Sequence, residues 1–214
     1  MGTLRGGYHL KDGTRVPSVT TILGRFKDAG PLMHWAWRMG CEGKDFRDVR
    51  DEAASAGTLA HEAVEAWARG EKPRFSGSEQ VQQRAMSGYG AFLDWASRSR
   101  LRVDRTELPL VSEKHRFGGT FDAILVDGRR AMGDWKTSNG IYPEYLCQLA
   151  AYGLLWEENF PSEPIDGGYD LLRFDKNYGD FTHKHWNELD TARKAFLLLR
   201  ELYDLEPELK ARAK

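Results

Sequence analysis

Two aspartates and a lysine lie close together in the second half of the chain. Asp134 and Lys136 are two residues apart, so their side chains leave the same face if this segment is a strand. Asp122 lies in the segment before it. Two carboxylates on one face repel each other unless one is protonated or a cation lies between them. Oxygen ligands favour Mg²⁺ or Mn²⁺, and a neighbouring lysine is suited to hold a water or a phosphate oxygen. A surface Asp–Lys ion pair is the ordinary alternative for this spacing.

The turn between the two segments decides whether Asp122 joins this group. The Asp-Gly pair at 127–128 predicts a β-hairpin. A two-residue loop would put Asp122 on the opposite face from Asp134. A three-residue loop, which pairs Val126 with Arg130, would place the two aspartates directly opposite each other, with side-chain roots about 4.5–5.5 Å apart. We favour the second register, and a β-bulge would have the same effect.

Two further pairs of polar residues have the spacing of neighbours on one helical face. His61 and Glu65 are four apart, and imidazole is a good metal ligand that could supplement two carboxylates. The alternative is a partly buried histidine with its hydrogen bonds satisfied. Gln148 and Tyr152 are also four apart and could hold a phosphate or a base. The alternative for them is a packed tyrosine with a glutamine at its edge.

The charge of the chain is nearly balanced but unevenly distributed. The 214 residues include 31 basic and 32 acidic side chains, a net charge of −1. Residues 1–50 hold nine basic and five acidic residues, whereas residues 151–214 hold nine and thirteen. A neutral total can therefore conceal a basic surface, although ordinary scatter of charge is an equal explanation. Within the positive segment, Trp35 or Trp37 could stack on the bases of a single strand, or both could be core residues.

The composition is that of an ordinary folded protein. Aromatic residues make up 12% of the chain, which argues against disorder. No apolar run reaches the roughly 18–20 residues of a membrane span, and no signal peptide is recognisable, so we expect a cytoplasmic protein. The two cysteines, Cys41 and Cys147, are too few for a disulfide framework or an iron–sulfur cluster.

The elements that must position these residues follow from apolar periodicity and turn signals. We expect helices at 18–23, from Pro31, and at 46–69, 78–98, 143–159 and 187–203. We expect strands at 101–111, 119–126, 130–136, 168–174 and 181–185. In the last helix, a row of apolar residues is expected to pack, namely Phe196, Leu197, Leu199 and Leu202. This order predicts an α/β fold with a central mixed sheet flanked by helices, preceded by a helical N-terminal half.

Taken in order, these residues resemble the motif series of the PD-(D/E)XK nuclease superfamily. The series is Gly57-x-x-x-His61, Gly119-x-x-Asp122, Asp134-x-Lys136-Thr137 and Gln148-x-x-x-Tyr152. It is most similar to the RecB-type branch, which includes phage and mitochondrial exonucleases and CRISPR-associated adaptation nucleases. Residues 16–23 also look like the start of phage-encoded members. Phe121 replaces the motif's proline and Asp134 its glutamate, and the branch accepts both.

The resemblance implies a restriction-endonuclease-like core and a role for each motif residue. His61, Asp122, Asp134 and the main-chain carbonyl of Trp135 would ligate one or two Mg²⁺ or Mn²⁺ ions, without an iron–sulfur cluster. Lys136 would orient and activate the attacking water. The remaining candidates, which would support the site or the substrate, are Gln148, Tyr152, Glu65, Glu107 and Arg173. Residues 1–214 would form one nuclease domain: a helical portion (1–100) that contributes His61, a catalytic core (101–185) and a C-terminal helix (186–214).

The expected function is therefore a divalent-metal-dependent DNA nuclease, an exonuclease, that attacks the phosphodiester in line with a metal-bound water. Its partner would be DNA, single-stranded or with free ends, and a replication or recombination protein is a candidate second partner. If the chain is phage-encoded, it would act in the host cytoplasm. The alternatives are an inactive nucleic-acid-binding or recombination-accessory protein with the same fold, a structure-specific endonuclease, and a phosphohydrolase of small esters. The chain has no Gly-rich phosphate loop, which disfavours the last of these.

Overall fold

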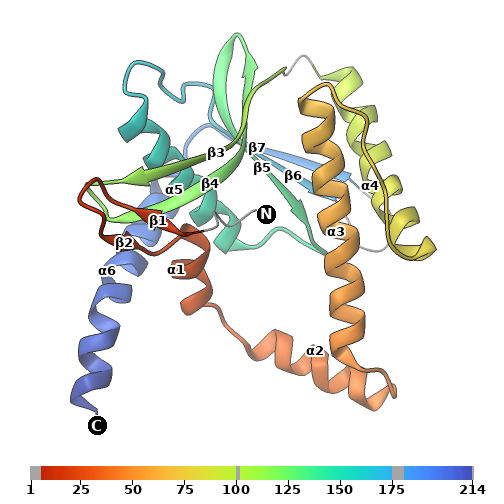
Figure 1. The fold of residues 1–214 in the computed structure, drawn as a ribbon, viewed down its shortest axis with the longest axis horizontal. Helices are drawn as coiled ribbons and strands as arrows, with labels where there is room; N and C mark the ends of the chain where they lie inside the picture. Colours follow the sequence, from red (N-terminus) through yellow and green to blue (C-terminus); the bar gives the residue numbers. More distant parts are fainter. Residues whose placement is uncertain (1–5, 100–101, 175–180, 214) are drawn as a thin grey trace.

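The computed structural model describes residues 6–99, 102–174 and 181–213 (Figure 1). Its helices are α1 (Val19–Arg25), α2 (Gly30–Cys41), α3 (Phe46–Ala68), α4 (Glu79–Arg98), α5 (Pro143–Asn159) and α6 (Asp190–Arg212). Its strands are β1 (Tyr8–His9), β2 (Arg15–Val16), β3 (Arg102–Ser112), β4 (Phe117–Asp127), β5 (Arg129–Thr137), β6 (Tyr169–Phe174) and β7 (Phe181–Trp186). The elements follow the expected order, and the expected strand start at residue 101 lies outside the described residues.

The central sheet is mixed, as predicted, with the strand order β3-β4-β5-β6-β7. Strands β3, β4 and β5 form an antiparallel meander. Strand β6 then pairs parallel to β5, and β7 pairs antiparallel to β6. The parallel pair requires a crossover, which α5 provides. Strand β5 is therefore central, with neighbours on both sides.

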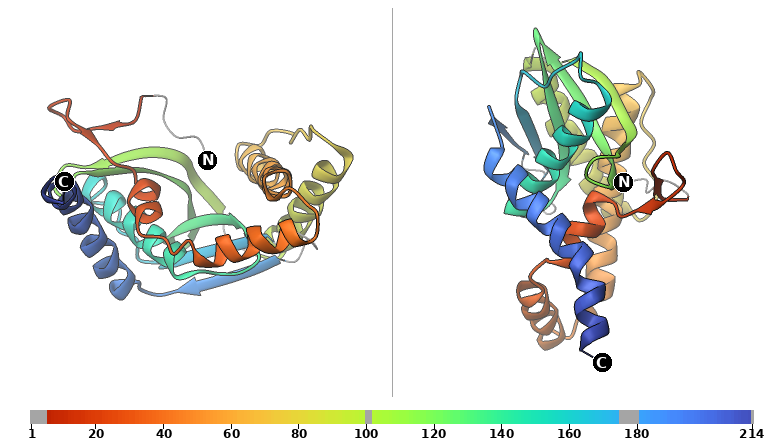
Figure 2. Two further views of the ribbon diagram at one scale, coloured as in Figure 1. Left: turned by 90° about the horizontal axis from the view of Figure 1, so that it is seen from below. Right: turned by 90° about the vertical axis from the view of Figure 1, so that its left-hand side faces the viewer.

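Helices cover both faces of this sheet (Figure 2). Alternation along the strands sends Ile124 and Met132 to a core shared with α1, α5 and α6. Leu125 and Trp135 point to the opposite face, where they pack with Phe92 of α4 and with α3. The sheet thus lies between two apolar layers, and the ends of its central strands can present polar groups between α3 and α5.

The helix starts follow the capping chemistry of the sequence. The hydroxyl of Ser18 accepts a hydrogen bond from the Thr21 N–H at 3.0 Å, which caps α1. Pro31 occupies the first turn of α2 and Pro143 the first turn of α5, where the missing N–H costs nothing. These local signals explain why the predicted helix starts are close to the observed ones.

Two expectations for the C-terminal helix are wrong. The helix does not end near residue 203 but continues through Pro207 to Arg212. Leu202 is also not packed, because it lies with three other exposed leucines on the outward face, namely Leu198, Leu205 and Leu209. The last turns project away from the body of the protein (Figure 1), so no neighbouring element ends the helix there. Ion pairs from Glu206 to Arg25 and to Lys210 support the helix beyond residue 203.

The first hairpin, β1–β2, was not expected from the sequence. It lies over β4, where the Tyr8 hydroxyl is 2.8 Å from the Thr120 hydroxyl. A side chain at Gly118 would collide with the Tyr8 ring, so glycine is required beneath it. Among the described residues, no helix is both long and apolar enough to cross a membrane.

Candidate active site

The hairpin register places the two aspartates as favoured from the sequence. Val126 pairs with Arg130, and the ladder continues to Ala123 and Gly133. The next positions along it are Asp122 and Asp134, which therefore lie opposite each other. Both side chains are buried, with 1% and 0% of their surface exposed. The main-chain N–H of Trp135 donates to Oδ2 of Asp122 at 2.7 Å, so the carboxylate is fixed against the neighbouring strand.

Asp134 combines burial with an incomplete set of partners. Its Oδ2 lies 2.5 Å from Nζ of Lys136. Its Oδ1 is buried and has no hydrogen-bond partner within the described part of the chain. Burial and, secondarily, the charge of Asp122 raise the pKa of Asp134 to about 7 against the opposing effect of Lys136. This oxygen is where an additional positive charge would stabilise the pair of carboxylates.

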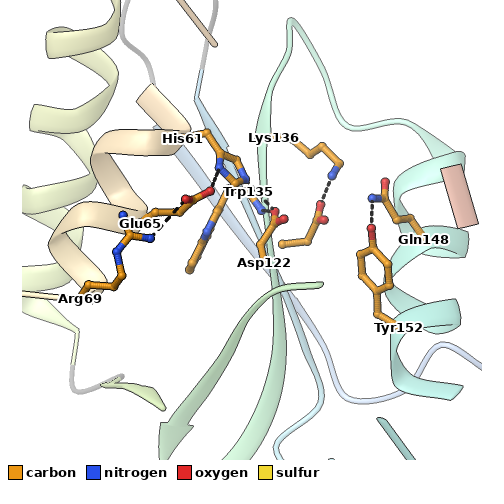
Figure 3. A network of polar contacts seen from close by, with 9 residues as sticks. His61, Glu65, Arg69, Asp122, Trp135, Lys136, Gln148 and Tyr152 are labelled. Carbon is orange, nitrogen blue, oxygen red and sulfur yellow. Dashed lines mark hydrogen bonds and ion pairs between the residues drawn. The ribbon is translucent and has the colours of Figure 1, made fainter. Parts of the chain in front are cut away.

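His61 extends the site from α3. Its Nε2 lies 3.3 Å from Oδ2 of Asp122, and its Nδ1 lies 2.7 Å from Oε1 of Glu65 (Figure 3). Burial opposes protonation of the ring, but Asp122 and Glu65 outweigh it and raise the pKa of His61 to about 10. Arg69 approaches Glu65 at 3.5 Å. The spacing of His61 and Glu65 on one helix face thus produces a continuous polar chain that ends on Asp122.

The close approach of α3 to β5 depends on Gly57. A Cβ built at Gly57 would lie 3.0 Å from Cβ of Thr137, tighter than ordinary van der Waals contact. Thr137 follows Lys136 directly, and Gly57 lies one helical turn before His61. The glycine of the first motif therefore sets the distance between the helix that carries His61 and the strand that carries Lys136.

Replacing Gly57 with alanine is therefore expected to move α3 away from β5. Because a shift of about 1 Å can cost two orders of magnitude in rate, any reaction catalysed at this site should slow roughly ten- to a hundredfold. The free energy of unfolding should change little. Alanine is favoured over glycine in a helix by up to about 1 kcal/mol, which offsets part of the strain from the close contact. The matched control is Gly90→Ala in α4, where a Cβ would meet nothing within 4 Å. Equal activity of the two variants, measured beside thermal melts, would contradict this role of Gly57.

Glu107 is the candidate site residue whose position could be predicted least from the sequence. Its neighbours Thr106 and Leu108 pair with Ala123 and Phe121, so Glu107 lies across from Asp122. Its φ is +50°, a backbone conformation that costs about 1–2 kcal/mol outside glycine and that often marks functional positions. Oε1 of Glu107 is buried without a hydrogen-bond partner among the described residues.

Glu107, His61 and Glu65 form a group that could hold a cation. One ligand atom from each lies within 4.8 Å of the others. Burial, followed by the charges of Asp122 and Glu65, raises the pKa of Glu107 to about 7. The pairing of β3 with β4 and the packing of α3 against β3 bring Glu107 here, so no helix or strand spacing in the sequence could have indicated it.

The other candidates surround the site without joining this cluster. Gln148 donates from Nε2 to the hydroxyl of Tyr152 at 2.7 Å, and both are buried, with the Tyr152 ring close against Gly119. Arg173 donates from Nη1 to the carbonyl oxygen of Ser138 at 3.0 Å, which braces the chain just after β5. Figure 3 shows Gln148 and Tyr152 on the side of Asp122 opposite His61.

Tyr145 is a neighbour of the site that the sequence did not indicate. Nζ of Lys136 lies 5.5 Å from the centroid of its ring, a distance suited to a cation–π contact. The charges of Asp134 and Asp122 outweigh the burial of Lys136 and raise the pKa of its ammonium group. The lysine is therefore held as a cation between a carboxylate and an aromatic ring.

The site thus consists of two opposed buried aspartates and a lysine on a mixed sheet, with a histidine from a flanking helix. This arrangement defines a class of α/β proteins with a buried carboxylate site that could hold a cation. A family model of the PD-(D/E)XK nuclease superfamily matches residues 6–212. The chain belongs to the PD-(D/E)XK nuclease superfamily, as the motif series predicted, and its fold is of the restriction-endonuclease-like α/β type.

Two solved structures are among those found in a structural comparison. A candidate exonuclease from Eubacterium rectale is 12% identical with a TM-score of 0.48, over 69% of this chain and 64% of the other. LHK-Exo in complex with dAMP, the alkaline exonuclease of Laribacter hongkongensis, is 16% identical with a TM-score of 0.37, over 73% and 85%. The chain thus spans just under two thirds of the Eubacterium rectale protein. A search of curated proteins found no match.

Proposed function

We propose that this chain is a divalent-metal-dependent DNA nuclease that hydrolyses phosphodiester bonds as an exonuclease. The observation that carries the proposal is the buried Oδ1 of Asp134, which lies beside Asp122 and Lys136 and has no hydrogen-bond partner in the part of the chain that the structure describes. Membership of the superfamily supports nuclease chemistry. We further propose that residues 1–214 act as one nuclease domain, with the helical portion 1–100 supplying His61 to the core at 101–185.

The donor set fits one or two Mg²⁺ or Mn²⁺ ions. Members of the superfamily generally use divalent metals. Asp134 and Glu107 each offer a buried carboxylate oxygen that has no hydrogen-bond partner among the described residues. Asp122, His61 and the carbonyl oxygen of Trp135 would complete the ligands, with Glu65 in support. An oxygen-rich set with one imidazole favours these cations over softer metals. When bound, such an ion polarises the phosphate and lowers the pKa of water.

The residues of the chain would divide the remaining work. Lys136 would hold the attacking water or a phosphate oxygen, and its ammonium would stabilise the charge that develops on the phosphate. Tyr145 and Asp134 would keep that ammonium in place. Glu65 would orient the imidazole of His61 through Nδ1, leaving Nε2 directed at the site. Gln148 and Tyr152 would brace the β4 side of the site, and Arg173 the segment that follows Lys136.

The preference for DNA and for free ends rests on the motif series alone, which is most similar to the RecB-type branch. An inactive nucleic-acid-binding protein and a structure-specific endonuclease remain the rivals. Retention of His61, Asp122, Asp134 and Lys136 in one buried cluster favours activity.

The test uses end-labelled linear DNA, single- and double-stranded, beside closed circular DNA of the same sequence. Each is incubated with the protein and Mg²⁺, Mn²⁺ or EDTA. We expect the linear DNA to shorten with a metal, the circles to stay closed, and EDTA to prevent cutting. Intact DNA in every arm would overturn the nuclease proposal, whereas opened circles would assign an endonuclease. Labels on the 5′ and 3′ ends would report the polarity.

Metal binding can be tested without turnover. Because a ligand that binds only the folded state stabilises it, Mg²⁺ or Mn²⁺ at about 100 times Kd should add about 2.7 kcal/mol. Thermal melts of Glu107→Gln should show a smaller shift with metal than wild type. The control is Glu201→Gln on the exposed face of α6. An unchanged metal-dependent shift in Glu107→Gln would remove Glu107 from the ligand set.

A further inference from the structure

Helix α2 presents an unusual outward face. Helical periodicity places Met33, His34, Trp37 and Arg38 on one side, and all four are exposed. Trp37 has 65% of its surface exposed and Met33 has 68%. A tryptophan is a costly residue to leave in water, because it has the largest aromatic side chain to bury. The outward face of α2 is therefore a surface that a ligand could cover.

The two tryptophans of this helix have different roles. Trp35 is half-buried and meets the ring of Phe46 edge-on, with the ring centroids 6.3 Å apart. It packs against Phe46 where α2 joins α3. Trp37 instead stacks on the imidazole of His34, with the centroids 5.6 Å apart and the planes 30° apart. The stacking holds the indole in one orientation on the outward face of the helix.

The charge around this ring suits an anionic ligand. Helix α2 contains no acidic residue, and Arg38 lies beside Trp37 on the outward face. In the part of the chain that the structure describes, Arg38 forms no ion pair with a carboxylate. The pKa of Glu42 is lowered chiefly by Lys44, which pairs with its carboxylate at 2.8 Å, and less by the charge of Arg38, so the guanidinium of Arg38 can still meet a phosphate. An exposed aromatic ring among cations is the pattern of surfaces that hold single strands, where bases stack on rings and phosphates meet the cations.

Both ends of α2 are tied to elements that carry the candidate active site. Just before the helix, Lys27 lies 3.0 Å from Glu144 of α5, the residue next to Tyr145. After the helix, the chain turns into α3, and Figures 1 and 2 show α2 joining the α1 side of the molecule to α3. His61 is fifteen residues beyond Phe46, which is roughly 22 Å along the axis of α3. A strand several nucleotides long that enters the site could reach α2.

We propose that the outward face of α2 binds a single nucleic-acid strand, with an unpaired base stacked on Trp37 and a phosphate beside Arg38. This inference rests on the proposed function and specifies its substrate as a strand whose bases are exposed. A paired duplex hides the faces of its bases, so it would gain nothing from Trp37.

The test measures binding in EDTA, so that it does not depend on cleavage. Two probes are compared, a fluorescent thymidine 12-mer and a 12-mer of abasic sites with the same phosphates. Wild type is expected to bind the thymidine probe about tenfold more tightly, within the range for one stacked base. Trp37→Ala should lose most of that preference, and Trp37→Phe should retain part of it. The control Met86→Ala, at a position of α4 with 54% of its surface exposed, should keep it. Arg38→Ala should weaken both probes alike and reduce the salt dependence.

The outcomes separate this inference from the proposed function. An unchanged preference in Trp37→Ala, or equal binding of both probes by wild type, would overturn the role of α2 even if DNA is cleaved. The predicted pattern without any cleavage would support the role of α2 and count against the nuclease. A dimer of the chain that Trp37→Ala dissociates would assign this face to a second copy instead. Circular dichroism and thermal melts confirm that each variant is folded.

Discussion

Replacing Lys136 with methionine, or Asp134 with asparagine, is expected to slow the proposed DNA cleavage by about a hundred- to a thousandfold. Removal of a single preorganised group that stabilises developing charge typically costs about a hundred- to a thousandfold. In the proposed mechanism Lys136 is such a group, and its ammonium lies 2.5 Å from Asp134 inside the protein. Asp134→Asn also removes the carboxylate that is proposed to ligate the metal, so it would slow the same step for a second reason.

The design of these variants separates chemistry from folding. Methionine keeps the apolar stem of Lys136, and asparagine keeps the shape of Asp134. The matched control is Lys184→Ala, an exposed lysine in β7 of the same sheet, which should cleave DNA at the wild-type rate. Rates are measured on end-labelled DNA at saturating metal, beside circular dichroism of each variant. A folded Lys136→Met protein that retains more than about a tenth of the activity would contradict the assigned role.

Truncating Phe92 to alanine is expected to lower the free energy of unfolding by about 3–5 kcal/mol. Phe92 has no exposed surface, and its ring contacts those of five other aromatic residues: Trp67, Tyr89, Trp95, Trp135 and Phe174. These belong to α3, α4, β5 and β6, so one ring joins the helical layer to the sheet. Truncation of the Phe92 side chain leaves a cavity, and the rigid rings around it cannot rearrange to fill it.

Denaturant unfolding measures this effect directly. Phe92→Leu keeps much of the volume and should cost clearly less than the alanine change. Leu205→Ala, at a position with 53% of its surface exposed, should change stability by no more than about 0.5 kcal/mol. A cost below about 1.5 kcal/mol for Phe92→Ala would show that the aromatic cluster is not a principal link between the layers. Because Phe92 packs on Trp135, residual activity should also fall as α3 loosens.

Much of the candidate site could be predicted because its spacing is local. Side chains two apart in a strand share a face, which places Asp134 beside Lys136. Residues four apart in a helix are neighbours, which places His61 beside Glu65. The choice between two hairpin registers was open on sequence grounds, and the ladder through Val126 and Arg130 confirms the favoured one.

The sequence by itself determined the order of the helices and strands, the hairpin and the motif pairs, because backbone periodicity, capping and turn chemistry act within a few residues. Only the tertiary structure decided which groups from distant segments meet. The positive φ of Glu107 and its place across from Asp122 depend on the pairing of β3 with β4. The partial burial of Trp35 and the exposure of Trp37 depend on what packs against α2. The physical reason is that burial and contact arise from packing between segments, which no local pattern encodes.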